Sequence, residues 1–150
     1  MTFVATGQAG DDEMADRIRR HRMDRPPSWT TVEAPTGLVP AVAGAADDAL
    51  VIVDCLTLWV ANVLGERTDG EVLRQADVLG SVAAARPAPT VVVSNEVGTG
   101  IVPADPATRR YRDLLGGVNA AVAAHAAAAW LLIAGRALPL HAPPSAPTGA

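Results

Sequence analysis

Residues 91–103 read VVVSNEVGTGIVP, an apolar run that passes into a polar turn punctuated by glycine. Three consecutive valines without apolar–polar alternation predict a strand buried on both faces, as in the parallel sheet of an α/β protein. Ligands bind beyond the carboxyl ends of such strands, where Asn95 and Glu96 would project. The alternative is a tight turn in which both side chains only cap backbone groups, since turns favour such residues.

Further apolar runs and helical patterns alternate along the chain. Strand-like runs lie at Thr2–Thr6, Ala49–Asp54 and Trp130–Ala134, with a shorter extended piece at Trp29–Glu33. Helical patterns lie at Asp11–Met23, Gly70–Ala85 and Asp105–Ala129. Strands that alternate with helices predict an α/β domain with a mainly parallel sheet covered on both faces.

Length and composition limit the organisation of the protein. A chain of 150 residues can form one domain with a sizeable core, which we expect over residues 1–140. Residues 141–150 are rich in proline and alanine and predict a disordered tail. Aromatic residues make up only 3% of the chain, so few large side chains can anchor the core. The expected anchors are Phe3, Trp29, Trp59, Tyr111 and Trp130.

Charge and cysteine usage exclude several classes. The formal net charge is −4, which argues against nucleic acid as a partner. Cys55 is the only cysteine, so an intramolecular disulfide and a cysteine-rich zinc site are both impossible. No apolar run approaches the roughly 18 residues of a membrane span, and the N-terminus has no secretory pattern. These features predict a cytoplasmic protein without a membrane span.

The run Val51–Asp54 has the form of a Walker B strand. In such strands an aspartate at the carboxyl end holds a nucleotide-bound Mg²⁺, directly or through water. The pattern is weak by itself, because apolar strands that end in aspartate are common and Asp54 could instead cap a turn.

Several motifs in order carry a more specific signal. They are TGQ at 6–8, DDEM at 11–14, RI at 17–18, HR at 21–22, RP at 25–26, WTTVE at 29–33, DCLTLW at 54–59 with Asn62, SNEVG at 94–98 and IVP at 101–103. Arg109, Arg112, Asp113, Gly116 and Asn119 continue the series. Together the motifs resemble the bifunctional adenosylcobinamide kinase / adenosylcobinamide-phosphate guanylyltransferase family of cobalamin biosynthesis. The resemblance extends from the first residues to about Leu140.

The resemblance implies a P-loop NTPase fold of the RecA-like, three-layer kind, and two reactions. The enzyme would phosphorylate adenosylcobinamide, using ATP or GTP, and then transfer GMP from GTP to adenosylcobinamide phosphate, giving adenosylcobinamide-GDP. In the second reaction a histidine attacks the α-phosphorus of GTP, and that histidine corresponds to His21. Such a two-step transfer is covalent catalysis and requires a neutral imidazole. Arg17 lies one helical turn before His21, where its charge would disfavour imidazolium and attract the triphosphate.

Without the resemblance, His21 would be interpreted as a solvated helix residue, and His125 and His141 carry no functional signal. The resemblance also implies a nucleotide site made of Thr6, Gly7, Gln8, Arg25, Pro26, Pro27, Ser28, Glu33 and Asp54, with Asp54 also holding Mg²⁺. Arg109 and Arg112, with Arg110, would present guanidinium groups for phosphate recognition near Asn95 and Glu96. The alternative for these arginines is a solvated basic helix face. Family members assemble as homo-oligomers, so we expect the same here.

The chain departs from the family at its start. Members begin with a strand, a phosphate-binding loop of the Gly-x-x-x-x-Gly-Lys-Ser type and a helix, whereas these 150 residues contain no such loop and no lysine. Loss of these elements predicts exposed apolar surface and an unpaired strand edge. An N-terminal truncation of the sequence is favoured by the intact His21 and Asn95–Glu96 motifs. The alternative is a catalytically impaired remnant that only binds a corrinoid or nucleotide, or pairs with intact subunits.

Overall fold

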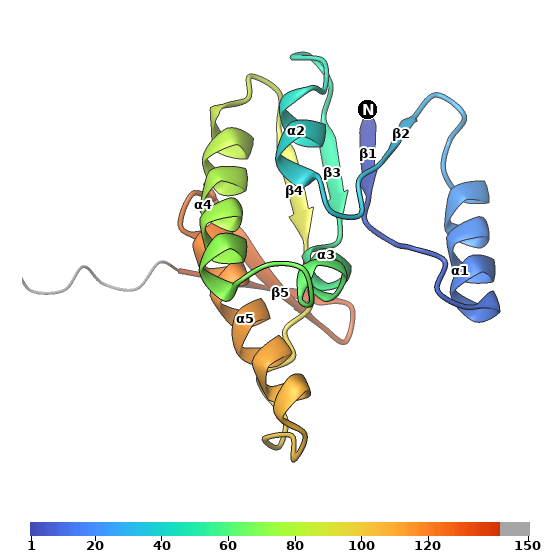
Figure 1. Ribbon diagram of the computed structural model, residues 1–150. Coiled ribbons are helices and arrows are strands. Elements are labelled where there is room, and N and C mark those ends of the chain that lie inside the picture. The colour runs from blue at the N-terminus through green and yellow to red at the C-terminus, as the bar shows by residue number, and fades with distance from the viewer. Residues whose placement is uncertain (142–150) are drawn as a thin grey trace, which may run out of the picture.

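The computed structural model describes residues 1–141, and the predicted tail beyond His141 lies outside the described residues. Helices and strands alternate through most of this range (Figure 1). The elements are β1 (Thr2–Ala5), α1 (Asp12–Met23), β2 (Thr30–Glu33), α2 (Leu38–Ala43), β3 (Val51–Asp54), α3 (Leu56–Val63), α4 (Asp69–Ala85), β4 (Thr90–Val93), α5 (Pro106–Ala123), β5 (Ala129–Ile133) and β6 (Arg136–Leu140). None of the helices in residues 1–141 is long and apolar enough to cross a membrane.

The main sheet has four parallel strands in the order β2-β1-β3-β4. Val4 lies opposite Val32 on one side and Val53 on the other, so the central strands are in register. The sequence-based prediction of a mainly parallel α/β sheet is therefore confirmed. All four carboxyl ends point to the same edge of the sheet, as parallel pairing requires.

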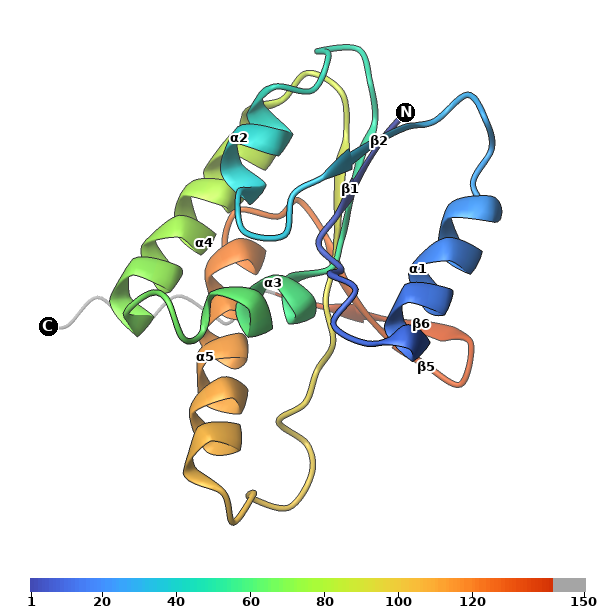
Figure 2. The ribbon, with the colours of Figure 1, turned by 45° about the vertical axis from the view of Figure 1, so that its right-hand side comes forward.

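The core lies between one face of this sheet and the helices α2 to α5. Val4, Val51 and Val53 are completely buried on that face. They belong to one cluster with Trp59 of α3 and Leu115 of α5. Helix α1 lies apart from these helices in both ribbon views and buries no residue of its own (Figures 1 and 2). Tertiary packing therefore stabilises α2 to α5 far more than it stabilises α1.

Side chains at the helix starts explain where the helices begin. Asp11 accepts a hydrogen bond of 2.7 Å from the backbone N–H of Met14 and caps α1. Thr68 and Glu71 form a reciprocal capping box at α4. Asp105 caps α5, and Pro106 follows it at the first helical position, where a missing N–H costs nothing.

Strand β4 is less buried than its sequence predicted. Val91 is 47% exposed and Val93 is 40% exposed, so the expectation of burial on both faces is wrong for this strand. Val92 packs against the core cluster, so Val91 and Val93 on either side of it project from the opposite face of the sheet. Among the described residues β4 also pairs only with β3 and forms an edge of the sheet. Strand β4 therefore carries exposed apolar side chains at an edge of the sheet.

The C-terminal strands form a separate hairpin. The predicted strand at Trp130–Ala134 exists as β5, but it pairs antiparallel with β6 instead of joining the main sheet. Positive φ angles at Ala134 and Gly135 make the two-residue turn, which matches the twist of the two strands. Trp130 is 60% exposed, so it does not serve as the expected core anchor. The preceding helix, α5, ends at Ala123 and not near Ala129.

Helix α2 was not predicted from the sequence. It has only six residues, and Pro40 stands within its first turn, where proline is tolerated because the N–H has no helical partner. Its residues Leu38 and Val42 are buried against the core, which explains why so short a segment is helical.

Candidate active site

The carboxyl ends of β1, β3 and β4 bring together three of the predicted regions. Thr6 follows β1, Asp54 ends β3, and Asn95 comes two residues after β4. The Thr6 N–H donates to the Asp54 carbonyl at 3.1 Å, so the first two strand ends are in direct contact. The structure thus places the predicted residues along the edge at which ligands bind in parallel sheets.

Thr6 has a structural role at this edge. Its side chain is completely buried, and its hydroxyl donates to the Cys55 carbonyl and accepts from the Cys55 N–H, both at 2.8 Å. The hydroxyl proton is thus used within the protein, where it holds the ends of β1 and β3 together. Gly7 and Gln8, which follow it, are more accessible to a ligand.

Asn62 of α3 connects two of the strand ends. Its Nδ2 atom donates to the Thr6 carbonyl at 2.8 Å and to the Pro35 carbonyl at 3.0 Å. One turn earlier in the helix, Trp59 Nε1 donates to the Thr36 carbonyl at 3.1 Å. The sequence pointed to Asn62 only as part of a motif, because a hydrogen bond to backbone 56 residues away leaves no local pattern.

His21 lies in the last turn of α1 with its side chain exposed. The next residue, Arg22, pairs with Glu33 at the end of β2, with 3.3 Å between Nη1 and Oε1. In the segment between β1 and α1, Gly7 lies close to Ile18 of α1, since a Cβ on the glycine would be 3.5 Å from that side chain. These two contacts attach the helix that carries His21 to the carboxyl edge of the sheet.

Arg25 lies over the ring of Phe3. Its guanidinium carbon is 3.6 Å from the centre of the Phe3 ring, and Trp29 stacks on Phe3 with ring centres 6.4 Å apart. Arg25 Nη1 also donates to the hydroxyl of Thr31 at 3.3 Å.

Burial lowers the pKa of Arg25, and the negative charge of Asp54 opposes that shift. Arg22 lowers the same pKa and Glu33 raises it, so all three charged groups act on this guanidinium. The structure thus gathers four predicted or neighbouring charged residues, Arg22, Arg25, Glu33 and Asp54, in one region.

The residues around Asp54 decide which kind of metal ion could bind there. Among residues 1–141 there is no cluster of three or more histidine, cysteine, aspartate or glutamate side chains that could hold a metal ion. Asp54 is half-buried at the strand end. A single carboxylate fits Mg²⁺ of the kind that is bound mainly by water and substrate phosphates, and does not fit a metal held by protein ligands alone.

Asn95 and Glu96 differ in their hydrogen bonds: the Glu96 side chain has a partner within the turn, whereas Asn95 is bonded through its backbone. The Glu96 carboxylate accepts a hydrogen bond of 2.5 Å from the Gly98 N–H, as the turn-capping alternative predicted. The backbone of Asn95 is held on both sides, by Thr57 Oγ1 at 3.0 Å and Asn119 Nδ2 at 3.1 Å. The fixed backbone at Asn95 leaves its side chain the better candidate for a ligand contact.

The three arginines of α5 have separate surroundings. Arg109 donates to the carbonyls of Pro103 and Ala104, so it closes the loop before the helix. Arg110 makes two hydrogen bonds to Asp69 of α4, at 2.9 and 2.7 Å. Among the described residues, Nη1 of Arg112 is buried without a hydrogen-bond partner. Arg109 and Arg110 are thus partly engaged in hydrogen bonds within the protein, while Arg112 has a buried donor that is unpartnered among the described residues.

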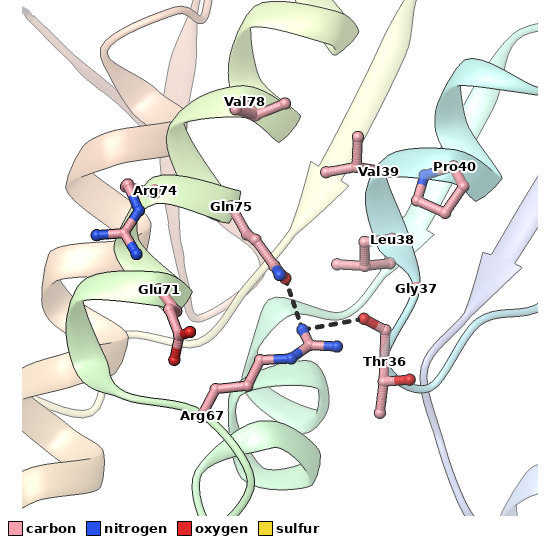
Figure 3. A pocket seen from close by; sticks show the side chains of 10 residues that line it. All are labelled: Thr36, Gly37, Leu38, Val39, Pro40, Arg67, Glu71, Arg74, Gln75 and Val78. Carbon is pink, nitrogen blue, oxygen red and sulfur yellow. Dashed lines mark hydrogen bonds between the residues drawn. The ribbon is translucent and has the colours of Figure 1, made fainter.

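A groove of about 600 Å³ lies elsewhere, between α2 and α4 (Figure 3). Arg67 crosses one end of it and donates to Gln75 Oε1 at 2.5 Å and to the Thr36 carbonyl at 3.4 Å. The other lining residues are Gly37, Leu38, Val39, Pro40, Glu71, Arg74 and Val78. None of the predicted site residues lines this groove, so it is distinct from the candidate active site.

The parallel sheet, the aspartate at the end of β3 and the charged residues at the same edge define an α/β protein of the P-loop NTPase kind. The family model described as "Cobinamide kinase / cobinamide phosphate guanyltransferase" matches residues 1–140. The chain belongs to this family, which confirms the resemblance seen in its motifs.

Three relatives are similar over most of their length. The bifunctional adenosylcobalamin biosynthesis protein CobP of Pseudomonas aeruginosa is 38% identical over 149 residues, covering 96% of this chain and 84% of the relative. The bifunctional adenosylcobalamin biosynthesis protein CobU of Escherichia coli is 38% identical over 147 residues, and that of Salmonella typhimurium is 36% identical over 147 residues. Each of these two alignments covers 89% of this chain and 81% of the relative. The chain is thus a member of an enzyme family of cobalamin biosynthesis.

Proposed function

We propose that this protein handles adenosylcobinamide in two reactions, phosphorylation and transfer of GMP from GTP to the resulting phosphate, with His21 as the nucleophile of the transfer. The observation that carries the proposal is the position of the exposed His21 segment beside the sheet edge, where Arg22 contacts Glu33. The family membership supports both reactions, since its description includes a kinase and a guanyltransferase.

The transfer would proceed in two steps, guanylylation of His21 and then transfer of GMP to the corrinoid phosphate. A neutral imidazole nitrogen of His21 attacks the α-phosphorus of GTP, so that a P–N bond forms, the bond to the bridging oxygen breaks and pyrophosphate leaves. A phosphate oxygen of adenosylcobinamide phosphate then attacks the same phosphorus. The P–N bond breaks, adenosylcobinamide-GDP forms, and the imidazole is released for another cycle.

The other site residues would serve binding and charge stabilisation. Arg17 and Arg25 would offset phosphate charge, and Arg112 would supply a further guanidinium group for the phosphates. Gly7, Gln8 and the segment Arg25–Ser28 would line the nucleotide, while Thr6 holds the strand ends behind them. Asp54 would hold Mg²⁺, and this ion neutralises charge on the phosphates when it is bound.

The kinase reaction is expected to be weak in the 150-residue chain. The chain has neither the glycine-rich phosphate loop nor a lysine, and these groups bind the transferred phosphate in P-loop enzymes. Purified chain incubated with ATP or GTP and adenosylcobinamide should therefore give little or no adenosylcobinamide phosphate. Robust turnover, measured by separation of the corrinoid products, would contradict this expectation.

A second candidate function is a non-catalytic subunit that binds corrinoid or nucleotide, or pairs with intact subunits. The unpaired edge of β4 and the exposed Val91 and Val93 favour this alternative, because such an edge can pair with another chain. Assembly as a homo-oligomer and a cytoplasmic location belong to the proposal in either case.

The deciding experiment uses GTP labelled at the α-phosphorus, with Mg²⁺ and purified protein. We expect label on the protein that is acid-labile and alkali-stable, as a phosphoramidate requires, and its loss in His21→Ala. His141→Ala is the matched control, since His141 lies outside the proposed site, and it should label like the wild type. Absence of label on folded wild-type protein would reject the transferase and leave the binding subunit.

A further inference from the structure

We infer that Asn62 is a positioning residue, whose single carboxamide sets the spacing between the two segments that carry His21 and Glu33. The inference rests on the proposed function, in which both segments border the nucleotide. It is carried by the two hydrogen bonds of Nδ2, to Thr6 at 2.8 Å and to Pro35 at 3.0 Å.

Both N–H groups of the Asn62 carboxamide donate hydrogen bonds. An asparagine NH₂ group has two protons, and each is directed to a different backbone carbonyl. The opposite orientation of the amide would place Oδ1 against both carbonyl oxygens, so the hydrogen bonds define which way the group points. Asparagine is also a weak helix former in the last turn of α3, so local propensity does not account for it.

Asn62 belongs to a connected set of hydrogen bonds at the sheet edge. Its partner Thr6 is bonded through its hydroxyl to both backbone groups of Cys55, and through its N–H to Asp54. The N–H of Ala34, next to Pro35, donates to the Ala5 carbonyl at 2.8 Å. The carboxamide therefore lies where the ends of β1, β2 and β3 converge.

The two segments that Asn62 joins lead directly to the proposed chemistry. The chain continues from Thr6 through Gly7 to the helix that carries His21, and Pro35 follows Glu33 by two residues. Beyond the β1–β2 ladder, in which Ala5 lies opposite Glu33, the helix that carries His21 meets the second segment through the Arg22–Glu33 ion pair, whose side chains are both exposed. An exposed pair of this kind contributes little and does not fix a geometry by itself. The half-buried Asn62 side chain joins the two segments at the point where they leave the ladder, which the exposed pair cannot do.

The first test compares Asn62→Asp with Val63→Ala. The aspartate has the same shape but places oxygens against two carbonyl oxygens, whereas Val63→Ala removes buried apolar atoms from the same helix without touching the edge. In single-turnover labelling from GTP, Asn62→Asp should slow the maximal rate about 10- to 100-fold, because small displacements of reacting groups have effects of this size. The GTP concentration for half-maximal rate should change much less. Val63→Ala should lower the Tm and leave the rate per folded molecule unchanged.

A second measurement does not depend on activity. Hydrogen exchange of backbone amides, followed by NMR, should be faster in Asn62→Asp and in the milder Asn62→Ala at Thr6 and Ala34, with the amides of Val4 and Val53 still protected. Val63→Ala should instead speed exchange throughout the core. Unchanged exchange at Thr6 and Ala34, or equal loss of rate in Asn62→Asp and Val63→Ala, would overturn the inference. If the wild type is not labelled at all, the proposed function fails, and the exchange data still decide the role of Asn62.

Discussion

Helix α3 and the β5–β6 hairpin are both rich in apolar side chains, but only α3 buries them. Leu56, Trp59, Val60 and Val63 of α3 are almost completely buried, while Trp130 and Leu132 of the hairpin are among the most exposed apolar residues. The difference shows that apolar composition predicts that an element forms, and that neighbours decide how much it contributes to stability. Hydrophobic stabilisation follows the area removed from water.

The two tryptophans give the largest test of this comparison. Trp59 is 1% exposed and also donates to the Thr36 carbonyl, so Trp59→Ala should lower the free energy of unfolding by about 3–5 kcal/mol. Trp130→Ala should change it by about 0.5 kcal/mol or less, as expected for an exposed side chain away from the core. Urea unfolding of both variants measures the difference. Similar losses would mean that the hairpin is packed in solution as firmly as α3.

A second comparison concerns the hydrogen bonds of a buried and an exposed threonine hydroxyl. Thr6→Val keeps the shape but leaves the N–H and carbonyl of Cys55 without that partner, which should cost about 1–3 kcal/mol. Thr30→Val, an equivalent change at an exposed position of β2, should have an effect within about 0.5 kcal/mol. The same unfolding measurement applies, and a neutral Thr6→Val would refute the structural role of this hydroxyl.

Helix caps sharpen the comparison between packed and unpacked helices. Thr68→Ala removes the cap of α4, a helix that buries four residues, and should cost about 1 kcal/mol of global stability. Asp11→Ala removes the cap of α1, which buries none, so the expected result is lower helix content in far-UV circular dichroism with a smaller change in global unfolding. If Asp11→Ala lowered the free energy of global unfolding more than Thr68→Ala does, tertiary packing would stabilise α1 more than its lack of buried residues indicates.

The smallest expected effect is a dependence of stability on pH. Hydrogen bonds from the Thr68 hydroxyl and N–H lower the pKa of Glu71, and those from the Thr108 N–H and hydroxyl lower the pKa of Asp105. Because the folded-state pKa lies below the unfolded one, this stabilisation is present above the unfolded pKa and is lost as the pH falls through the folded pKa. Urea unfolding from neutral pH to about pH 3 should show the decline. Thr68→Ala should make it shallower, and an identical slope in that variant would contradict the assignment.

The sequence predicted the elements more reliably than their surroundings. Continuous apolar runs gave β1 and β3, and the helical pattern at Gly70–Ala85 gave α4 to within one residue, so local patterns were sufficient there. The edge position of β4 and the separate hairpin were not predictable, because periodicity contains no information about which strand lies beside another.

The same limit applies to the candidate site. The motifs pointed correctly to residues at the carboxyl ends of the strands, where the structure places Asp54 and Asn95. They did not distinguish Arg110, bound to Asp69, from Arg112, which has a buried donor without a partner. They also did not separate the buried Thr6 from the accessible residues that follow it. These distinctions depend on partners 40 or more residues away, as in the 41-residue separation of Arg110 and Asp69.

The buried Cys55 gives the molecule its own reporter. It is the only thiol in the chain, it lies between Asp54 and the start of α3, and its backbone is bonded to Thr6. A thiol reagent can reach a buried cysteine only when the surrounding structure opens. The rate of Cys55 modification in the unlabelled, natural sequence therefore measures how often the strand ends separate, and a nucleotide that closes this edge should slow that rate.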